Sequence, residues 1–377
     1  MYAANAVVAA LFACSGPVAI ILAVGARGGL TESDIASWIF GAFCINGIIG
    51  IVFSLLYRQP LIFLWSITGA VLVGPALGHL SFPEVIGAFY ATGLLMFLLG
   101  LSGWVRRAMD AAPMPIVMAM VAGMFLRFGI DLVLAFRDQV WIALPMTVVF
   151  VLLTMKENLG RYVPPLIGAL IVGGLAVWQL GLFKPGAELF AFAAPNLYVP
   201  QFSWSAMVEL VVPLAVTVLV VQNAQGIAVL NANGHAAPIN AITAVCGAGS
   251  ILTAITGAVS TCLTGPVNAI LSANGARERQ YTGALFMSAF ILAFGLLAPF
   301  FTRLLLATPP AFIAALAGLA MLRVLQTAFN ASFGGKFSFG ALVCFLVTVA
   351  DVPIFNIGAA FWGLVFGLAA SWLLERR

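Results

Sequence analysis

Two short stretches, 60–77 and 257–272, combine small polar side chains with glycine inside otherwise apolar sequence. The hydroxyl and thiol side chains that we expect to bind substrate there are Ser66, Thr68, Ser260, Thr261 and Cys262. A helix that begins inside a membrane offers free backbone N–H groups and the positive end of its dipole, and both favour an anion such as a carboxylate. We therefore expect each stretch to be a short strand followed by a half-helix, with the two helix starts facing each other around a carboxylate.

The local sequence predicts where each half-helix begins. Residues 60–65 are bulky and β-prone, so 66–69 should open the first half-helix. Residues 256–259 should be extended, and 260–264 should open the second half-helix. The alternative is a pair of helices kinked by Gly and Pro, with hydroxyls bonding back to the chain. The aromatic side chains that could form an apolar wall for the ligand are Phe12, Phe63 and Trp65.

The stretch 204–230 carries three amide side chains, Gln222, Asn223 and Gln225, in an otherwise apolar helix. Amides are costly in lipid and must face protein or a water-filled cavity. We expect Gln222 and Asn223 to orient the bound substrate, and hydrogen bonding between helices is the alternative. Ser15, midway along the first apolar run, is a weaker candidate for substrate binding because small residues also serve packing.

Few ionisable residues fall inside the apolar stretches. Glu209 has no partner in the neighbouring sequence, and an intramembrane carboxyl group of this kind can carry a proton. We expect Glu209 to be the proton-coupling residue, with a structural hydrogen bond at a helix start as the alternative. Arg127 and Asp131 are four residues apart, so they share a helix face and should form a structural ion pair.

The composition identifies the class of protein that must position these residues. Of the 377 residues, 63% are hydrophobic and 7% are charged, and the mean hydropathy is +1.14. Soluble domains carry about 25% charged residues, so a cytosolic enzyme, a nucleic-acid binder and a disordered chain are excluded. Enzyme motifs are missing, and the 5 cysteines and 2 histidines lack metal-ligand spacing. We expect a polytopic all-α membrane protein that is not an enzyme, with no metal, no cofactor and no disulfide.

About fourteen segments are apolar enough to cross or enter a bilayer. They lie near 5–26, 35–56, 60–77, 83–101, 113–135, 139–155, 163–183, 204–230, 238–256, 257–272, 281–301, 309–327, 337–350 and 353–374. The third and tenth segments are short and interrupted by Gly and Pro. A polar-leaning spacer, 184–203, separates the two halves.

Basic residues mark the cytoplasmic side of a membrane protein. An even number of spans places both chain ends on one side, and charge favours a cytoplasmic location for both. The cytoplasmic loops and tail then hold Arg58, Arg106, Arg107, Lys156, Arg161, Arg277, Arg279, Lys336, Arg376 and Arg377. The opposite side holds only Arg27, Arg137, Lys184 and Arg303.

The halves 1–183 and 204–377 are predicted to be two seven-span repeats. The sequence Ile-Thr-Gly-Ala-Val at 67–71 recurs at 255–259, and each copy is followed by a Gly-Pro pair. A match of five common membrane residues can also arise by chance. An odd number of spans inverts the second copy, and interrupted segments at corresponding places in inverted halves indicate a transporter binding site.

Several motifs resemble the benzoate/proton symporter (BenE) family over nearly the whole chain. In the second half they lie at 202–230, 309–320 and 357–365. In the first half they are Ala36-Ser37-Trp38, Trp65-Ser66, Gly100-Leu101-Ser102-Gly103-Trp104 and Leu126-Arg127-Phe128-Gly129. Three site positions depart from the usual family pattern, at 65–69, at Gln225 in place of a proline, and at 258–262.

The resemblance implies the fold of uracil- and sulfate-type transporters, in which spans 1, 3, 8 and 10 build the substrate site. It implies a core domain of spans 1–4 and 8–11 (about 5–101 and 204–301) and a gate domain of spans 5–7 and 12–14 (about 113–183 and 309–374). The expected function is proton-coupled import of benzoate or a similar small aromatic carboxylate by elevator-type alternating access. The alternative is an anion or nucleobase transporter, exchanger or channel on the same fold. The expected partners are the substrate, a proton, the lipid of a bacterial-type inner membrane and a second copy in a homodimer, with no nucleic acid.

Overall fold

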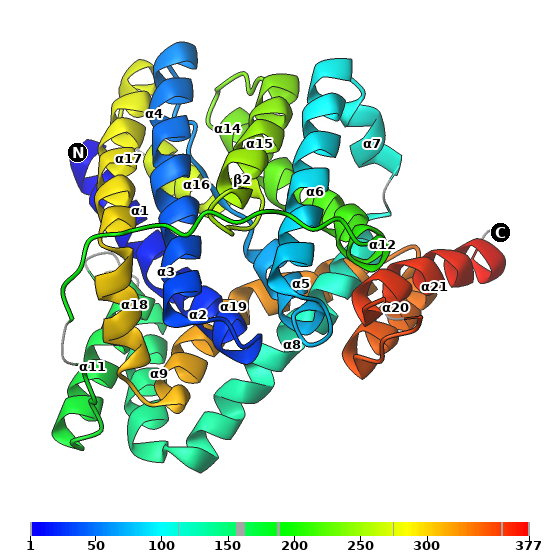
Figure 1. Cartoon of the computed structure of the whole chain (residues 1–377). Helices are drawn as coiled ribbons and strands as arrows, with labels where there is room; N and C mark the ends of the chain where they lie inside the picture. The colour runs from blue at the N-terminus through cyan, green and yellow to red at the C-terminus, as the bar shows by residue number, and fades with distance from the viewer. Residues whose placement is uncertain are drawn as a thin grey trace.

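The computed structural model describes residues 2–111, 113–155, 163–186, 189–273, 275–355 and 357–375 (Figure 1). The basic residues used for the orientation prediction that lie outside these ranges are Lys156, Arg161, Arg376 and Arg377.

The described part of the chain is a helical bundle with a single pair of very short strands. The first half contains α1 (Tyr2–Cys14), α2 (Gly16–Arg27), α3 (Glu32–Phe40), η1 (Gly41–Ile45), α4 (Asn46–Tyr57), β1 (Phe63–Trp65), α5 (Ile67–Ala76), α6 (Phe82–Ser102), α7 (Val105–Ala111), α8 (Met114–Asp138), α9 (Val140–Met155) and α11 (Pro165–Gln179). The second half contains α12 (Trp204–Ala206), η2 (Met207–Val211), α13 (Val212–Val216), η3 (Thr217–Asn223), α14 (Ala224–Ala232), α15 (Ile239–Ala254), β2 (Thr261–Leu263), α16 (Gly265–Ser272), η4 (Arg277–Arg279), α17 (Gln280–Leu296), α18 (Ala298–Leu306), α19 (Pro310–Phe333), α20 (Ser338–Ala350) and α21 (Ala359–Leu374).

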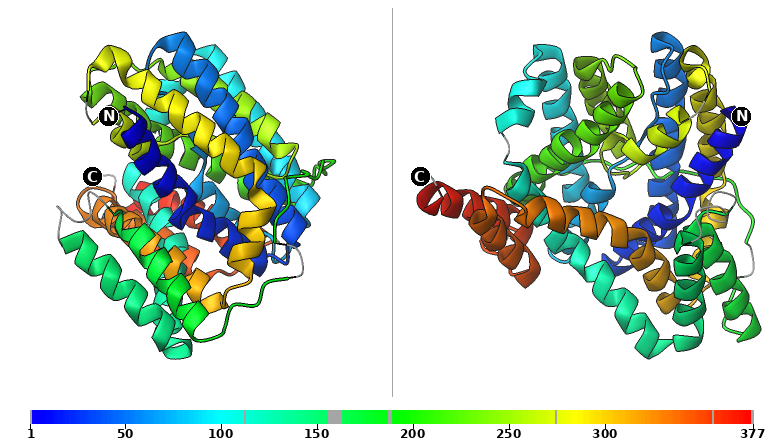
Figure 2. Two further views of the ribbon diagram at one scale, coloured as in Figure 1. Left: turned by 90° about the vertical axis from the view of Figure 1, so that its left-hand side faces the viewer. Right: turned by 180° about the vertical axis from the view of Figure 1, so that it is seen from behind.

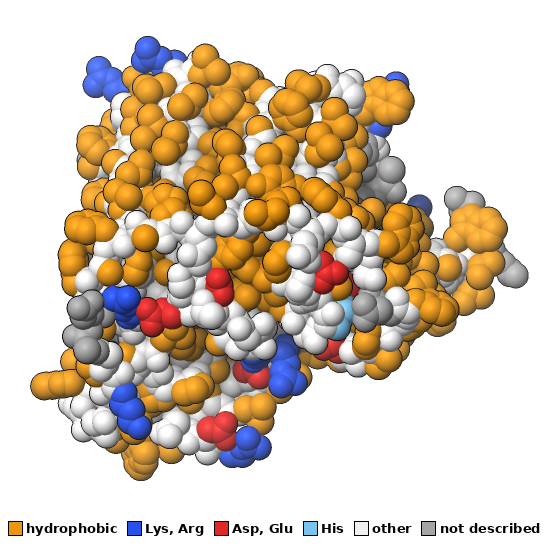
Figure 3. Space-filling model, in the orientation of Figure 1, with side chains coloured by type: hydrophobic (Ala, Val, Ile, Leu, Met, Phe, Trp, Pro, Cys, Tyr) orange, Lys and Arg blue, Asp and Glu red, His pale blue; other side chains and the backbone are white. Residues whose placement is uncertain are grey.

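Helix length and hydropathy agree with a multi-pass membrane protein. Among the described residues, six continuous helical stretches are long and apolar enough to span a bilayer. A seventh candidate is the pair α17 and α18, which is bent by 64°. Shorter apolar helices and α16 account for the remaining predicted segments within the described residues. Hydrophobic side chains cover most of the face over α4, α17, α15 and α6, while charged groups gather in a band below it (Figure 3).

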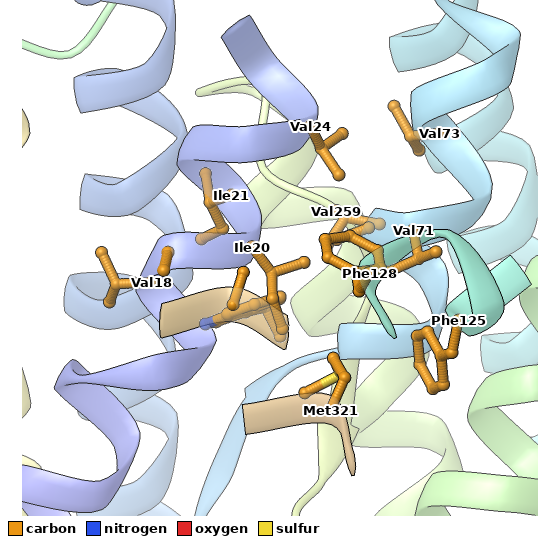
Figure 4. Close-up of a cluster of buried hydrophobic side chains, with 14 of the residues drawn as sticks. Val18, Ile20, Ile21, Val24, Val71, Val73, Phe125, Phe128, Val259 and Met321 are labelled. Atoms are coloured by element: carbon orange, nitrogen blue, oxygen red, sulfur yellow. The ribbon is translucent and has the colours of Figure 1, made fainter. Parts of the chain in front are cut away.

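The helices pack in two groups that meet along α2 and α5. In the first helix group α6 packs on α15, and α17 packs on both α1 and α4. In the second helix group α8 packs on α19 and α20, α20 on α21, and α9 on α11. Side chains of α2 and α5 join Phe125 and Phe128 of α8 and Met321 of α19 in one buried cluster between the groups (Figure 4). Helices α1 and α21 lie on opposite sides of the molecule (Figure 2).

An extended strap, residues 189–203, crosses the outside of the first helix group and joins the two halves (Figure 1). Its backbone N–H groups at Ala193, Tyr198 and Gln201 donate to the carbonyls of Leu296, Ile255 and Pro83, respectively. The Tyr198 hydroxyl also bonds the Asp34 carboxylate, and burial together with this bond raises the pKa of the tyrosine. The predicted spacer is therefore a structural element of the first helix group.

The second interrupted segment begins its helix later than expected. Residues 260–264 were expected to open the half-helix, but 261–263 form β2, Thr264 precedes the helix, and α16 starts at Gly265. The Ile-Thr-Gly-Ala-Val match is also misleading, because 67–71 belongs to α5 whereas 255–259 forms the turn before β2. The two copies occupy non-equivalent places, and Thr264, rather than Ser260, precedes its helix as Ser66 precedes α5.

Candidate functional site

Strands β1 and β2 bring the starts of two half-helices together in the first helix group. The strands are antiparallel, with Phe63 opposite Leu263 and Trp65 opposite Thr261. Beyond this ladder, the backbone N–H of Ser66 donates to the carbonyl of Ser260 at 2.8 Å. All three residues of each strand are buried, so α5 and α16 both begin inside the protein. The prediction of a strand followed by a half-helix is therefore correct for both segments.

Polar side chains satisfy the backbone of the strand pair. Asn223 Oδ1 accepts from the N–H of Leu263 at 2.8 Å, and Asn268 Oδ1 accepts from the N–H of Ile62 at 3.0 Å. The hydroxyl of Ser250 accepts from the N–H of Thr261 at 3.0 Å. Non-helical backbone inside a membrane is tolerated only when its polar groups find such partners. These residues therefore make the interruption of the two spans possible.

The predicted hydroxyl residues are all buried here, but they differ in their hydrogen-bond partners. Ser66 Oγ caps α5 by accepting from the N–H of Gly69 at 3.0 Å, and it also lies 3.0 Å from Thr68 Oγ1. Thr261 Oγ1 donates to Asn46 Oδ1 at 2.9 Å. Among the described residues, none offers a hydrogen-bond partner to Ser260 Oγ, although this residue is fully buried. Ser66 is therefore the cap of α5, whereas the Ser260 hydroxyl, which precedes β2, has no partner in the described chain.

The remaining predicted residues differ in burial and in hydrogen bonding. Asn223 is fully buried, and its Nδ2 finds no partner within the described chain. Gln222 is half-buried, whereas Trp65 and Cys262 are buried beside the helix starts. Ser15 lies at the break between α1 and α2, where its hydroxyl donates to the carbonyl of Phe12 at 3.1 Å.

Gln225, at the position where the resemblance leads us to expect proline, lies directly against the second helix start. A Cβ added at Gly265 would lie 2.6 Å from Gln225 Cγ, so the glycine makes room for this side chain. The amide of Gln225 therefore contacts the first residue of α16, and it is solvent-exposed. This departure from the family pattern thus changes the immediate surroundings of the helix start.

A cavity with a volume of about 360 Å³ lies between the two helix groups, and we call it the interface cavity. Its lining residues are Val24, Arg27, Val71, Leu72, Gly74, Pro75, Gly123, Met124, Leu126, Arg127, Phe128, Ile130, Glu209, Leu210, Thr348, Val349, Asp351, Gly358, Ala359 and Ala360. Of the predicted site residues in the described chain, only Glu209 and Arg127 line it. The cavity therefore runs along the later part of α5, beyond the helix start at Ser66.

An ion-pair cluster stands at the cavity. Arg127 Nε lies 3.4 Å from Asp131 Oδ1, which confirms the predicted pair on α8. Arg27 of α2 also bonds Asp131 through the other carboxylate oxygen, a contact that joins the two helix groups. The guanidinium of Arg27 lies 5.9 Å from the centre of the Phe128 ring. Arg27 and Asp131 are 104 positions apart, so sequence spacing gave no indication of this pair.

Glu209 has a partner from a distant part of the chain. Its Oε2 lies 2.8 Å from Nε2 of His79, and the Glu209 residue is 4% exposed. The second helix group contacts the same carboxylate. Gly358 lies so close to it that a Cβ added at this glycine would collide with the Glu209 side chain. Both Glu209 and Asn223 lie in π-helical turns, which often occur at functional sites. The isolated carboxylate of the sequence is thus half of a Glu–His pair at the boundary between the groups.

Within the described ranges, no three His, Cys, Asp or Glu side chains converge as a metal site would require. All five cysteines are described, and none of them forms a disulfide there.

Buried half-helix starts, polar groups around them and a cavity between two helix groups define a membrane transporter of the inverted-repeat class. The chain belongs to the BenE family, described as benzoate membrane transport protein, which matches residues 2–373. It is 30% identical to the inner membrane protein YdcO of Escherichia coli K12, over 95% of this chain and 92% of that protein. It is 26% identical to the benzoate membrane transport protein of Acinetobacter baylyi, over 97% of this chain and 93% of that protein.

Solved structures of other transporters share the fold. The transmembrane domain of the cyanobacterial bicarbonate transporter BicA matches with a TM-score of 0.60 at 14% identity, covering 97% of this chain and 96% of that domain. The SLC26A9 structure matches with a TM-score of 0.68 at 14% identity, and this chain spans 64% of its length. The chain therefore has two inverted repeats of seven spans and is a multi-pass inner-membrane transporter rather than an enzyme.

Proposed function

We propose that this protein is a proton-coupled symporter that imports benzoate or a similar small aromatic carboxylate. The observation that carries the proposal is the meeting of the starts of α5 and α16 on the β1–β2 pair. These starts offer hydroxyls and positive dipole ends for a carboxylate. The name of the relative from Acinetobacter baylyi supports the same substrate class.

The substrate carboxylate would bind Ser66 and Ser260, with Thr68 and Thr261 beside them. Asn223 Nδ2 and Gln222 would orient the carboxylate from the long helical span 204–232, and the aromatic ring would pack on Trp65. The fully buried Ser260 hydroxyl and Asn223 Nδ2 support this assignment, because buried polar groups normally have partners. A neutral site of hydrogen bonds and dipoles favours reversible binding, which transport requires.

Proton coupling would use the Glu209–His79 pair. Glu209 belongs to the first helix group but touches Gly358 of the second, so its protonation state acts on the boundary between them. The other charged groups that line the same cavity are Arg27, Arg127 and Asp351. Movement of the first helix group, as the core, against the second, as the gate, would then provide alternating access.

The positive charge of the loops supports cytoplasmic locations for both chain ends, with the interface cavity on the outer side. The family resemblance supports a homodimer as the oligomeric state. Native mass spectrometry of the detergent-solubilised protein tests the dimer.

Uptake of labelled benzoate by proteoliposomes, with and without an inward proton gradient, tests the function. Neutral benzoic acid crosses bilayers unaided, so uptake by protein-free liposomes must be subtracted at each pH. We expect the gradient to drive accumulation well above that background. Accumulation that ignores the gradient would instead support an exchanger or channel on the same fold, and an absence of protein-dependent uptake would reject benzoate.

A further inference from the structure

The interface cavity is lined by apolar side chains and by guanidinium groups. Val71 and Leu72 of α5 and Met124 of α8 contribute apolar lining, and Arg127 lines the same space. Its volume of about 360 Å³ lies within the range of pockets that enclose small molecules. An aromatic carboxylate needs both elements, an apolar surface for its ring and a donor pair for its charge.

Arg127 retains donors for a ligand. A guanidinium has five N–H donors, whereas Arg127 contacts Asp131 through Nε at 3.4 Å and its side chain is 65% exposed. The other oxygen of Asp131 is engaged by Arg27, so one carboxylate balances two guanidinium groups. Glu209 is engaged by His79 rather than by either arginine. Within this cluster Arg27 and Arg127 share the single carboxylate of Asp131, and the acidic residues that line the cavity itself are Glu209 and Asp351.

The interface cavity is separate from the site at the helix starts. Leu72 lies six residues along α5 from Ser66, which corresponds to about 9 Å at the helical rise per residue. Both positions lie on the same half-helix, with Ser66 capping its start and Leu72 within it.

We propose that the interface cavity is an entry subsite, where Arg127 binds the substrate carboxylate before the substrate reaches the half-helix starts. The ring packs on Val71 and Leu72 of α5, and the carboxylate forms a charge-assisted pair with the guanidinium. Asp131 competes with the substrate for Arg127 and keeps capture weak. This inference rests on the proposed function, because it takes the same aromatic carboxylate as ligand.

Benzoate uptake kinetics in right-side-out and inverted membrane vesicles test the subsite. Arg127→Gln removes the guanidinium group from the cavity. We expect KM for benzoate to rise about tenfold in right-side-out vesicles, with Vmax retained. In inverted vesicles KM should stay unchanged, because the substrate enters from the other side. Arg137→Gln, on the same helix but outside the cavity, is the matched control. Asp131→Asn should lower KM, since it releases both arginines, whereas a purely structural role for the cluster predicts impaired uptake in both variants.

The outcomes separate the subsite from the function. A KM in Arg127→Gln that equals the wild-type value, or that rises equally in both vesicle orientations, overturns the entry subsite and leaves the symport proposal intact. Wild-type vesicles without protein-dependent benzoate uptake overturn the proposed function, and the subsite with it.

Discussion

Asn223 Oδ1 accepts the backbone N–H of Leu263 at 2.8 Å, which ties the π-helical turn η3 to strand β2. The bond links residues 40 positions apart and satisfies a donor that the interrupted span would otherwise leave unpaired. An amide that the sequence assigns to substrate binding is thus also part of the scaffold.

Replacement of Asn223 by Ala should destabilise the protein by about 1–3 kcal/mol, because the Leu263 N–H becomes a buried donor without an acceptor. The measurement is thermal unfolding in detergent, followed by tryptophan fluorescence. The exposed neighbour Gln225→Ala is the control and should unfold at the wild-type temperature. An unchanged unfolding temperature for Asn223→Ala would contradict the scaffold role.

Ser260→Ala separates binding from stability. No described residue bonds the Ser260 hydroxyl, so its removal should leave thermal stability unchanged. Benzoate affinity, measured by isothermal titration calorimetry, should fall roughly ten- to a hundredfold through loss of a donor to a charged acceptor. Ser288→Ala, which removes another hydroxyl without a described partner, should leave affinity unchanged. Wild-type affinity in Ser260→Ala would remove this residue from the site.

Ser66→Ala should weaken benzoate binding by a similar factor and also cost about 1 kcal/mol of stability, because it removes the cap of α5. Thermal unfolding and calorimetry on the same preparation check both effects. If only stability falls, Ser66 is a cap and not a ligand-binding residue.

Glu209→Gln should abolish the response of uptake to a proton gradient while exchange of labelled for unlabelled benzoate continues. The amide keeps the size of the side chain but carries no proton between the two faces. Glu84→Gln is the control, since Glu84 forms a capping box with Ser81 at the start of α6. Gradient-driven accumulation by Glu209→Gln would assign the coupling elsewhere.

Helices α6 and α15 approach so closely that no side chain fits between them at Gly247. A Cβ there would collide with the backbone of Phe97, so Gly247→Ala should force the helices apart and lower the yield of folded protein. At Gly174 of α11 no described atom lies within 4 Å of an added Cβ, so Gly174→Ala should be tolerated. Size-exclusion profiles of the two variants, expressed in parallel, make the comparison.

The spans could be predicted well from the sequence, because a segment that crosses a bilayer must be apolar and its hydropathy shows this. Sequence reasoning also predicted the interrupted third and tenth segments, since Gly and Pro are visible where a helix must stop. It could not predict the start of α16, because 260–264 has the polar residues of a helix start and the strand at 261–263 depends on pairing with β1. Pairing partners lie far away in sequence, and propensity carries no information about them.

The same reason explains the side chains that were missed. His79 and Arg27 lie near the ends of apolar segments, where charged residues are ordinary, and only the fold brings them to Glu209 and Asp131. Asn46 and Asn268 each fall singly within apolar stretches and were overlooked, although a lone amide in a span requires a partner. Such isolated amides are a signal that sequence reasoning could have used.

The extended strap that crosses the first helix group offers a labelling position for measuring movement between the two helix groups. Its backbone N–H groups at Ala193, Tyr198 and Gln201 all donate to carbonyls of the first helix group, so the strap is held to that group at three points. Leu197 on the strap is 76% exposed, and Val133 on α8 of the second group is 68% exposed. The distance between spin labels at these two positions would therefore report a displacement of one group relative to the other.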